Sequence, residues 1–333
     1  MRICIYGAGA VGGLMAAWLA RAGHEVCVVA RGAQLDAIRR DGLRVRDRET
    51  SAVLATPISA DNEPAKLGPQ DAVIVTVKAQ GLAEVASRIA PLLGEDTTVV
   101  TAMNGVPWWF FDRLPLAKGR RLESLDPGGR LARAMPTERI VGCVIHLAAS
   151  TPEPGLILHN MGTKLILGEP GGQNTARTAN IVAALQGAGF ECVTSPQIEK
   201  DFWVKLLGNV SFNPVSALTL STADRLIGDP LVKAYMVTVM REVLAIGRAV
   251  GVDAAIDPEA RIDMARALGK FKTSMLQDME AGKSLEIDGL LTGTLEVAQF
   301  AGVAAPYTES LLGLIRVRAE TTGQHGSARP AAP

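Results

Sequence analysis

The sequence has only four cysteines, Cys4, Cys27, Cys143 and Cys192, and none belongs to a CxxC pair or to a Cys/His cluster with metal spacing. Each lies in or beside an apolar run. We therefore expect reduced core residues rather than disulfides, zinc ligands or a catalytic thiol. No His/Cys/Asp cluster elsewhere suggests a metal site, so none is expected.

Long apolar runs are also missing. The longest, residues 72–77 and 140–149, are too short or too interrupted to span a bilayer, which takes about 20 residues. Residues 2–6 lead straight into a glycine loop, which leaves no room for the apolar core of a signal peptide. We expect a cytoplasmic protein without a membrane-spanning segment.

The sequence lacks an excess of charge of either sign, because 34 basic residues balance 34 acidic ones. With a pI of about 6.9 and no basic stripe, nucleic acid and anionic membranes are not expected as partners. The 48% hydrophobic content nevertheless indicates a globular chain, and 333 residues favour two domains over a single core.

A glycine-rich loop follows the buried strand expected over residues 2–6. In its GxGxxG pattern the first glycine allows a tight turn, the second lets the backbone approach a pyrophosphate, and the third lets the next helix pack closely. A helix over 14–22 and a second strand over 25–30 complete the expected βαβ unit. The residues expected to contact a dinucleotide are Gly7, Ala8, Gly9, Ala10, Val11 and Gly12.

Two basic residues could extend this site. Arg31 closes the second strand, where NAD-specific proteins usually carry an acid for the ribose 2′-hydroxyl. An arginine there suits a 2′-phosphate, which predicts NADP(H), unless it is a solvated residue that opens the next helix. Lys78 ends the strand expected over 71–78, at the carboxyl edge where ligands bind. It either reaches the cofactor or is simply solvated.

Asn104 follows the strand expected over 98–103, again at a carboxyl edge. Its amide can hold a nicotinamide or a substrate oxygen, or it is a turn residue beside Gly105. The aromatic segment 107–111 behind it is expected to be mostly core. Residues 118–137 are expected to form a mobile insertion.

The pattern changes near residue 195. Before it, short turns join strand-like runs, and such short links predict antiparallel pairing. After it, the apolar residues recur only with the spacing of helices. One of these helices, expected over 231–250, is long and apolar and is either core or a homodimer surface. The predicted fold is an α/β Rossmann-type dinucleotide-binding domain followed by an all-α domain. The three runs joined by short turns lie at 139–148, 155–159 and 164–168, and a helix over 175–186 leads to a last strand at 191–194. The domains are expected at 1–195 and 196–320, with a disordered tail at 321–333.

Lys205 and Asn209, in the helix expected over 198–212, and Asn213 directly after it recur four residues apart. With about 3.6 residues per turn, they stack along one side, while leucines and Phe212 cover the rest. Lysine is rarely buried without a partner, so in isolation a solvated face is the preferred interpretation.

In this order the motifs resemble the ketopantoate reductase family (2-dehydropantoate 2-reductases) over nearly the whole chain. The resemblance implies an active site between a nucleotide-binding and a helical domain, and reduction of a 2-keto acid by hydride from NADPH. It rests on residues 7–12, 77–79, 104–106, 205–213, 273–278 and 286–288.

The resemblance also implies roles for single residues. Lys205 matches the general acid of the family and Glu286 its active-site carboxylate. A lysine suits this task because hydride arrival builds alkoxide charge that it can stabilise and protonate. Taken alone, Glu286 could be a solvated residue before a helix, and Ser274 a helix-start serine. The positions that match substrate-binding residues are Asn104, Asn209, Asn213 and Ser274.

The sequence departs from the family pattern directly after Val106, where residues 107–111 could form an aromatic wall that reshapes the pocket. Ketopantoate is the leading substrate. The first alternative is a reductase of another bulky 2-keto acid or similar carbonyl. The second is a non-catalytic NADP-sensing protein, although such a protein has no reason to keep Lys205, Ser274 and Glu286.

Overall fold

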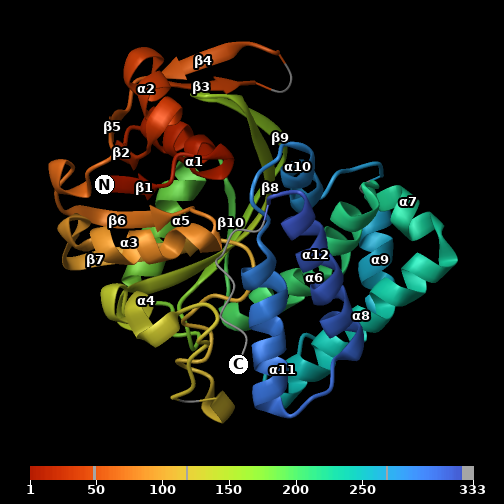
Figure 1. Ribbon diagram of the computed structural model, residues 1–333. Helices are drawn as coiled ribbons and strands as arrows, with labels where there is room; N and C mark the ends of the chain where they lie inside the picture. Colours follow the sequence, from red (N-terminus) through yellow and green to blue (C-terminus); the bar gives the residue numbers. More distant parts are fainter. Residues whose placement is uncertain (48–49, 118, 268, 325–333) are drawn as a thin grey trace. The chain divides into compact units, whose positions relative to one another are not determined.

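The computed structural model describes residues 1–47, 50–117, 119–267 and 269–324 and divides into two compact units, drawn in Figure 1. The first comprises Met1–Met103 and Gly129–Ile198; the second comprises Asn104–Gly128 and the chain from Glu199 onward. The sequence prediction had placed residues 104–128 in the nucleotide-binding domain. Chain order could not reveal this, because the segment leaves one unit and packs in the other.

The first unit is built on a mixed β-sheet. Its order among the described residues is β4-β3-β9-β8-β7-β6-β1-β2-β5, and β10 pairs with β9. Neighbours from β8 through β2 are parallel, which places the ends of β1 and β6 at one edge. The strands are β1 Arg2–Tyr6, β2 Glu25–Val29, β3 Leu43–Arg46, β4 Val53–Thr56, β5 Ser59–Asp61, β6 Gln70–Val75, β7 Leu93–Ala102, β8 Ile140–Glu153, β9 Leu156–Gly168 and β10 Glu191–Thr194.

The antiparallel pair β8–β9 confirms the predicted pairing but corrects its extent. The two runs expected at 155–159 and 164–168 belong to one strand, and no turn separates them. Gly162 has φ +69°, and a Cβ there would clash with the carbonyl oxygen of His146. The glycine that suggested a turn therefore marks an irregularity within a continuous strand.

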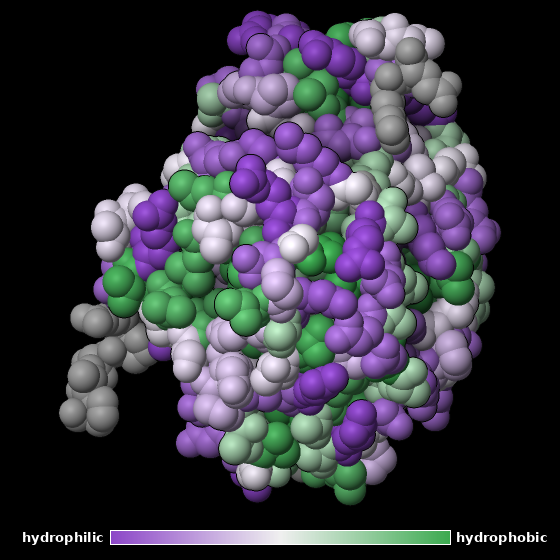
Figure 2. Space-filling view, turned by 90° about the vertical axis from the view of Figure 1, so that its right-hand side faces the viewer, coloured by the Kyte–Doolittle hydropathy of each residue, from purple (hydrophilic) through white to green (hydrophobic). Residues whose placement is uncertain are grey.

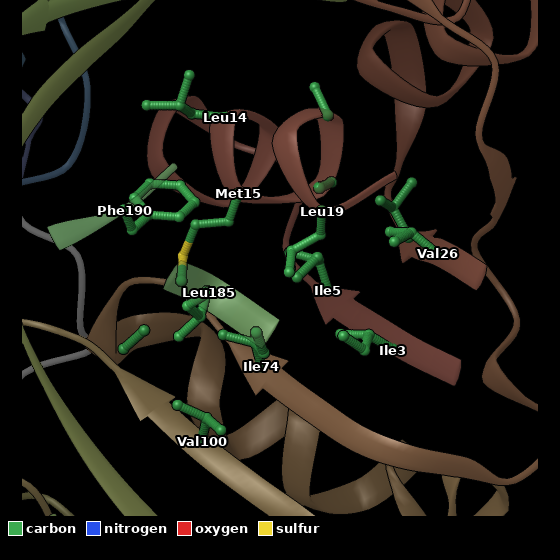
Figure 3. Close-up of a cluster of buried hydrophobic side chains, with 14 of the residues drawn as sticks. Ile3, Ile5, Leu14, Met15, Leu19, Val26, Ile74, Val100, Leu185 and Phe190 are labelled. Atoms are coloured by element: carbon green, nitrogen blue, oxygen red, sulfur yellow. The ribbon is translucent and has the colours of Figure 1, made fainter. Parts of the chain in front are cut away.

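Helix α1 (Ala10–Arg21) covers one face of the central strands (Figure 3). Leu14, Met15 and Leu19 on the helix belong to one buried cluster with Ile3 and Ile5 of β1. Successive strand side chains point to opposite faces, so Cys4 lies outside this cluster. The other helices of the unit are α2 Gly32–Asp41, α3 Leu82–Arg88, α4 Arg130–Ala134 and α5 Ala176–Gly187. All four cysteines are free and buried, as predicted.

The second unit contains helices and turns but no strand among its described residues, so the predicted fold class of a Rossmann-type domain plus an all-α domain is confirmed. Helix α6 continues past Pro214, where the prediction had ended it. The segment after residue 287 is a π-helical turn before it becomes an α-helix. The elements are α6 Ile198–Thr219, α7 Ala223–Gly228, α8 Pro230–Ala249, α9 Pro258–Ala267, α10 Ser274–Glu280, the π-turn Asp288–Thr292, α11 Gly293–Ala301 and α12 Pro306–Thr321.

The aromatic segment belongs to the core of the helical unit, as expected. Trp109 packs edge-on against Phe202, with ring centroids 5.4 Å apart, and Phe110 lies 5.3 Å from Trp203. Phe111 is likewise buried. These contacts explain why the segment separates from the sheet unit, since its apolar surface is covered by α6.

The segment predicted to be a mobile insertion is instead tied down. The carboxylate of Glu296 accepts hydrogen bonds from the backbone N–H groups of Glu123, at 2.7 Å, and Ser124, at 2.9 Å. Asp126 is buried, and helix α4 follows within the predicted insertion. Sequence could not anticipate these contacts because the anchor is a single glutamate far along the chain. Position 118 lies outside the described residues.

The predicted disordered tail begins too early. Helix α12 includes Thr321, and Gln324 is only 4% exposed. Its side-chain N–H groups donate to the carbonyl oxygens of Asp278, at 3.0 Å, and Lys283, at 2.8 Å, and its own carbonyl accepts from Leu285 N–H at 3.1 Å. Gln324 therefore fixes the turn that precedes Glu286. Residues 325–333 lie outside the described part of the chain.

Among the described residues, membrane-spanning helices and groups of metal ligands are absent, and the face drawn in Figure 2 is of mixed character. No helix within the described ranges has the length and apolarity needed to cross a membrane. Those same ranges contain no group of three or more His, Cys, Asp or Glu side chains placed to hold a metal ion. Hydrophobic and hydrophilic residues are intermixed on the face drawn in Figure 2.

Candidate active site

The glycine loop connects β1 to α1 through a tight turn. Gly7 has φ +109°, and its carbonyl oxygen accepts a 2.6 Å hydrogen bond from Thr76 Oγ1 at the end of β6. Gly9 precedes α1 and makes no side-chain cap, and a Cβ added to it would meet nothing within 4 Å. A Cβ on Gly12 would lie well under 3.0 Å from the Gly7 carbonyl oxygen. The unpaired N–H groups at the start of α1 remain available to an anion.

Two side chains that the sequence did not single out hold this loop in shape. Gln34 on α2 donates to the carbonyl oxygen of Ala8 at 2.6 Å and accepts from Gly155 N–H at 2.9 Å. Thr76 supplies the contact to Gly7 described above. Both are neutral and carry no motif, so only the fold shows their role as supports.

The two basic residues lie beside the loop within the same unit. Arg31 precedes α2, its side chain is 67% exposed, and it pairs with Glu84 of α3. An ion pair so exposed contributes about 0–1 kcal/mol, so a phosphate can displace the carboxylate at small cost. Lys78 is half-buried and follows Val77, whose side chain lies against Gly7.

In the helical unit, Lys205 does not lie on a solvated face. It is half-buried, and its ammonium donates a 2.7 Å hydrogen bond to Asn104 Oδ1. Asn209 is also half-buried, and no hydrogen bond to its side chain is formed by any described residue. Leu206 and Leu207 on the same helix are buried. The neutral amide of Asn104 therefore helps to orient the lysine.

The backbone after Asn104 is locked onto the segment that contains Glu286. Gly105 has φ +83°, and a Cβ there would clash with the backbone of Gly289. Val106 N–H donates to the Gly289 carbonyl oxygen at 2.9 Å. Gly289 belongs to the π-turn, and such turns often occur at functional sites. Glu286, half-buried just before this turn, is thus held near the residues that follow Asn104.

Ser274 is the first residue of α10 but does not cap it. That role belongs to Thr273, whose hydroxyl accepts from Leu276 N–H at 3.2 Å. Asn213, which is 6% exposed, donates to Ser274 Oγ at 3.4 Å. Ser274 is therefore a helix-start residue that does not cap the helix, and it also lies at the far end of the α6 stripe.

Two models of one protein family match this chain. Residues 3–172 match the family model "Ketopantoate reductase PanE/ApbA", and residues 197–319 match "Ketopantoate reductase PanE/ApbA C terminal". The chain belongs to the ketopantoate reductase family. Together the two matches cover both units and include the glycine loop and the α6 stripe.

Individual relatives extend over the full length of this ketopantoate reductase family member. A 2-dehydropantoate 2-reductase of Mesorhizobium japonicum is 42% identical over 95% of this chain and 97% of its own. A solved structure described as a candidate ketopantoate reductase of Ralstonia solanacearum MolK2 is 49% identical, with a TM-score of 0.93 over 97% of this chain and 99% of that one. A PanE/ApbA family ketopantoate reductase of Ralstonia eutropha JMP134 is 29% identical, with a TM-score of 0.82 over 97% and 100%.

The predicted site residues of this family member thus form two groups. The glycine-loop residues, Arg31 and Lys78 lie on the sheet unit. Asn104, predicted to contact cofactor or substrate, lies on the helical unit with the other predicted substrate and catalytic residues, where the structure joins Lys205 to Asn104 and Asn213 to Ser274. Sequence reasoning missed the supporting residues, because a lone glutamine, threonine or glutamate has no signature. They are Gln34, Thr76, Glu84 and Gln324.

Proposed function

We propose that this chain reduces 2-dehydropantoate to pantoate with NADPH. The observation that carries the proposal is the half-buried Lys205 ammonium held 2.7 Å from Asn104 Oδ1, on the helix that also carries the amides of Asn209 and Asn213. The full-length similarity to a 2-dehydropantoate 2-reductase supports the substrate. The residues of the glycine loop and Arg31 would hold the cofactor, which supplies the hydride when bound.

Lys205 provides the electrophilic and acidic function in this proposal. As hydride adds to the carbonyl carbon, negative charge grows on the oxygen, and an ammonium within hydrogen-bond distance both stabilises that charge and donates the proton. Glu286 orients the lysine or binds the substrate hydroxyl. Asn209, Asn213 and Ser274 bind the remaining oxygen atoms through directional hydrogen bonds.

A panel of 2-keto acids tests the proposal directly. With NADPH oxidation followed by absorbance, 2-dehydropantoate should exceed pyruvate, 2-ketoisovalerate and phenylpyruvate in kcat/KM by about 100-fold, the discrimination that a few polar contacts to a substrate hydroxyl provide. Similar values across the panel would favour a reductase of another keto acid. Cofactor binding without oxidation by any acid would indicate a sensing protein. The aromatic segment 107–111 is buried core and does not itself favour a bulkier substrate.

Arg31 is expected to set the preference for NADPH. Replacing Arg31 by Ala should raise the KM for NADPH about 10–100-fold and change that for NADH less than about threefold, because only NADPH carries the phosphate that the guanidinium binds. A matched control is Glu84→Gln, which removes the carboxylate that now pairs with Arg31 and should leave NADPH affinity equal or improved. Equal losses for both cofactors in Arg31→Ala would refute the assignment.

Two further parts of the proposal concern the setting of the enzyme. We propose a cytoplasmic location, which the four reduced, buried cysteines fit. A homodimer stays a prediction that light scattering after size-exclusion chromatography can test. Helix α8, one candidate surface for it, has Val239, Met240 and Val243 fully buried and so serves as core along that face.

A further inference from the structure

Arg261 on α9 lies against the catalytic helix. A Cβ built on Gly208 of α6 would lie 2.5 Å from Arg261 Nη2 and 3.4 Å from its Nε. The guanidinium therefore occupies the space that any larger side chain at position 208 would need. Residues three and four apart share a helix face, so Gly208 neighbours Lys205 on that face and directly precedes Asn209. The guanidinium therefore lies against α6 at the position between Lys205 and Asn209 in the sequence.

No acidic side chain of the described residues pairs with Arg261, and no hydrogen bond to its guanidinium is formed within those ranges. The acids nearby on α9 are engaged elsewhere. Glu259 pairs with Lys233 at 2.6 Å, and Asp263 pairs with Arg266 at 2.8 Å. Arg261 itself is partly withdrawn from water, and this burial lowers its pKa.

Such an arrangement is costly unless an anion completes it. An arginine stays protonated in proteins, so it cannot relieve the cost of desolvation by losing its proton as a lysine can. In the free protein, a partly desolvated cation without a counterion loses hydration free energy, and no ion pair compensates for that loss. The planar fork of the guanidinium is suited to bind a carboxylate through two parallel hydrogen bonds.

We propose that Arg261 binds the carboxylate of the 2-keto acid substrate and selects for anionic substrates. The inference rests on the proposed function and deepens it. Lys205 and Arg261 then divide the work: the lysine faces the carbonyl oxygen, where charge develops, and the arginine neutralises the charge that the substrate already carries. Gly208 is the residue that lets both cations approach one small molecule.

The test compares a charged substrate with its neutral counterpart. In Arg261→Gln, kcat/KM for 2-dehydropantoate should fall about 100-fold, the loss expected for a bidentate charged hydrogen bond, whereas kcat/KM for its methyl ester should change less than about threefold. Arg261→Lys keeps the positive charge but not the planar guanidinium, so its kcat/KM for 2-dehydropantoate should lie between those of the wild type and Arg261→Gln. Thermal melts of each variant with and without NADPH check that folding is retained.

Gly208 offers an independent variant that leaves Arg261 in place. Gly208→Ala should displace the guanidinium and lower kcat/KM for the acid more than for the ester. Both changes remove the same interaction between the guanidinium and the carboxylate. The double variant Gly208→Ala/Arg261→Gln should therefore have a kcat/KM for the acid only slightly lower than that of Arg261→Gln alone. Additive losses would contradict the shared contact.

Several outcomes would overturn the proposal. Equal losses for acid and ester would assign Arg261 a purely structural role. Weaker NADPH binding by Arg261→Gln in the absence of substrate, with the acid-to-ester ratio unchanged, would show that a cofactor phosphate is the anion. Wild-type turnover of 2-dehydropantoate tests the proposed function separately. If the wild type does not turn over, calorimetry with pantoate on the NADP⁺-loaded protein decides: lost binding in Arg261→Gln supports the carboxylate contact, and unchanged or absent binding refutes it.

Discussion

Lys205→Ala should reduce kcat about 1,000-fold or more while the Kd for NADPH stays within about twofold. The substitution removes both the group that stabilises the developing alkoxide and the proton donor, and each contribution is about 100-fold or larger in comparable enzymes. NADPH binding should persist because the glycine loop and Arg31 belong to the other compact unit. Stopped-flow measurement of NADPH oxidation and fluorescence titration of the cofactor provide the two numbers.

The control for this experiment is Lys272→Ala. Lys272 is an exposed lysine of the same unit that pairs with Glu280 at 2.7 Å, and its removal should leave kcat unchanged. Asn104→Ala should show a smaller loss than Lys205→Ala, because it frees the ammonium without removing it. Wild-type turnover by Lys205→Ala would refute the proposed acid and with it the mechanism.

Substitutions of two glycines in the same loop should fail in different ways. Gly9→Ala should fold normally, since its φ of −76° suits alanine and the added Cβ meets nothing within 4 Å, yet it should weaken NADPH binding about 100-fold because the methyl group occupies the approach of the pyrophosphate. Gly12→Ala should lose both binding and stability, by about 3 kcal/mol or more, because the Cβ overlaps backbone.

Urea unfolding and NADPH titration of both variants separate the two effects. Gly23→Ala is not a suitable control, because its φ of +87° would strain an alanine. Gly187→Ala on α5 is better: a Cβ there meets nothing, and the position lies far along the chain from the loop. A Gly9→Ala protein with unchanged NADPH affinity would show that the cofactor does not approach the loop at that residue.

The fold was predictable wherever local pattern decides it. Strands β1 and β10 have the predicted bounds, because each is a short run closed by turn residues. Helix α6 was predicted to end before Pro214, since proline removes a hydrogen-bond donor and clashes with the preceding turn. It continues to Thr219 because buried packing on residues such as Val215 and Ala217 outweighs that penalty.

The site was predictable as a set of residues but not as a set of contacts. The four-residue spacing on α6 located Lys205 and Asn209, yet the hydrogen bond from Lys205 to Asn104 joins positions 101 residues apart. Arg261 and Gln324 belong to no motif, and their roles follow only from where α9 and the end of α12 pack. Spacing along one helix is local information, whereas counterions and anchors are supplied by tertiary structure.

The discontinuous helical unit has a consequence for synthesis on the ribosome. Trp109, Phe110 and Phe111 leave the exit tunnel well before Phe202 and Trp203, the rings against which two of them pack. The sheet unit can form in the meantime, since domains fold as they emerge. During that time the aromatic segment lacks the rings of α6 against which it packs in the folded protein. The nascent chain therefore presents an apolar stretch suited to chaperone capture until α6 has been made.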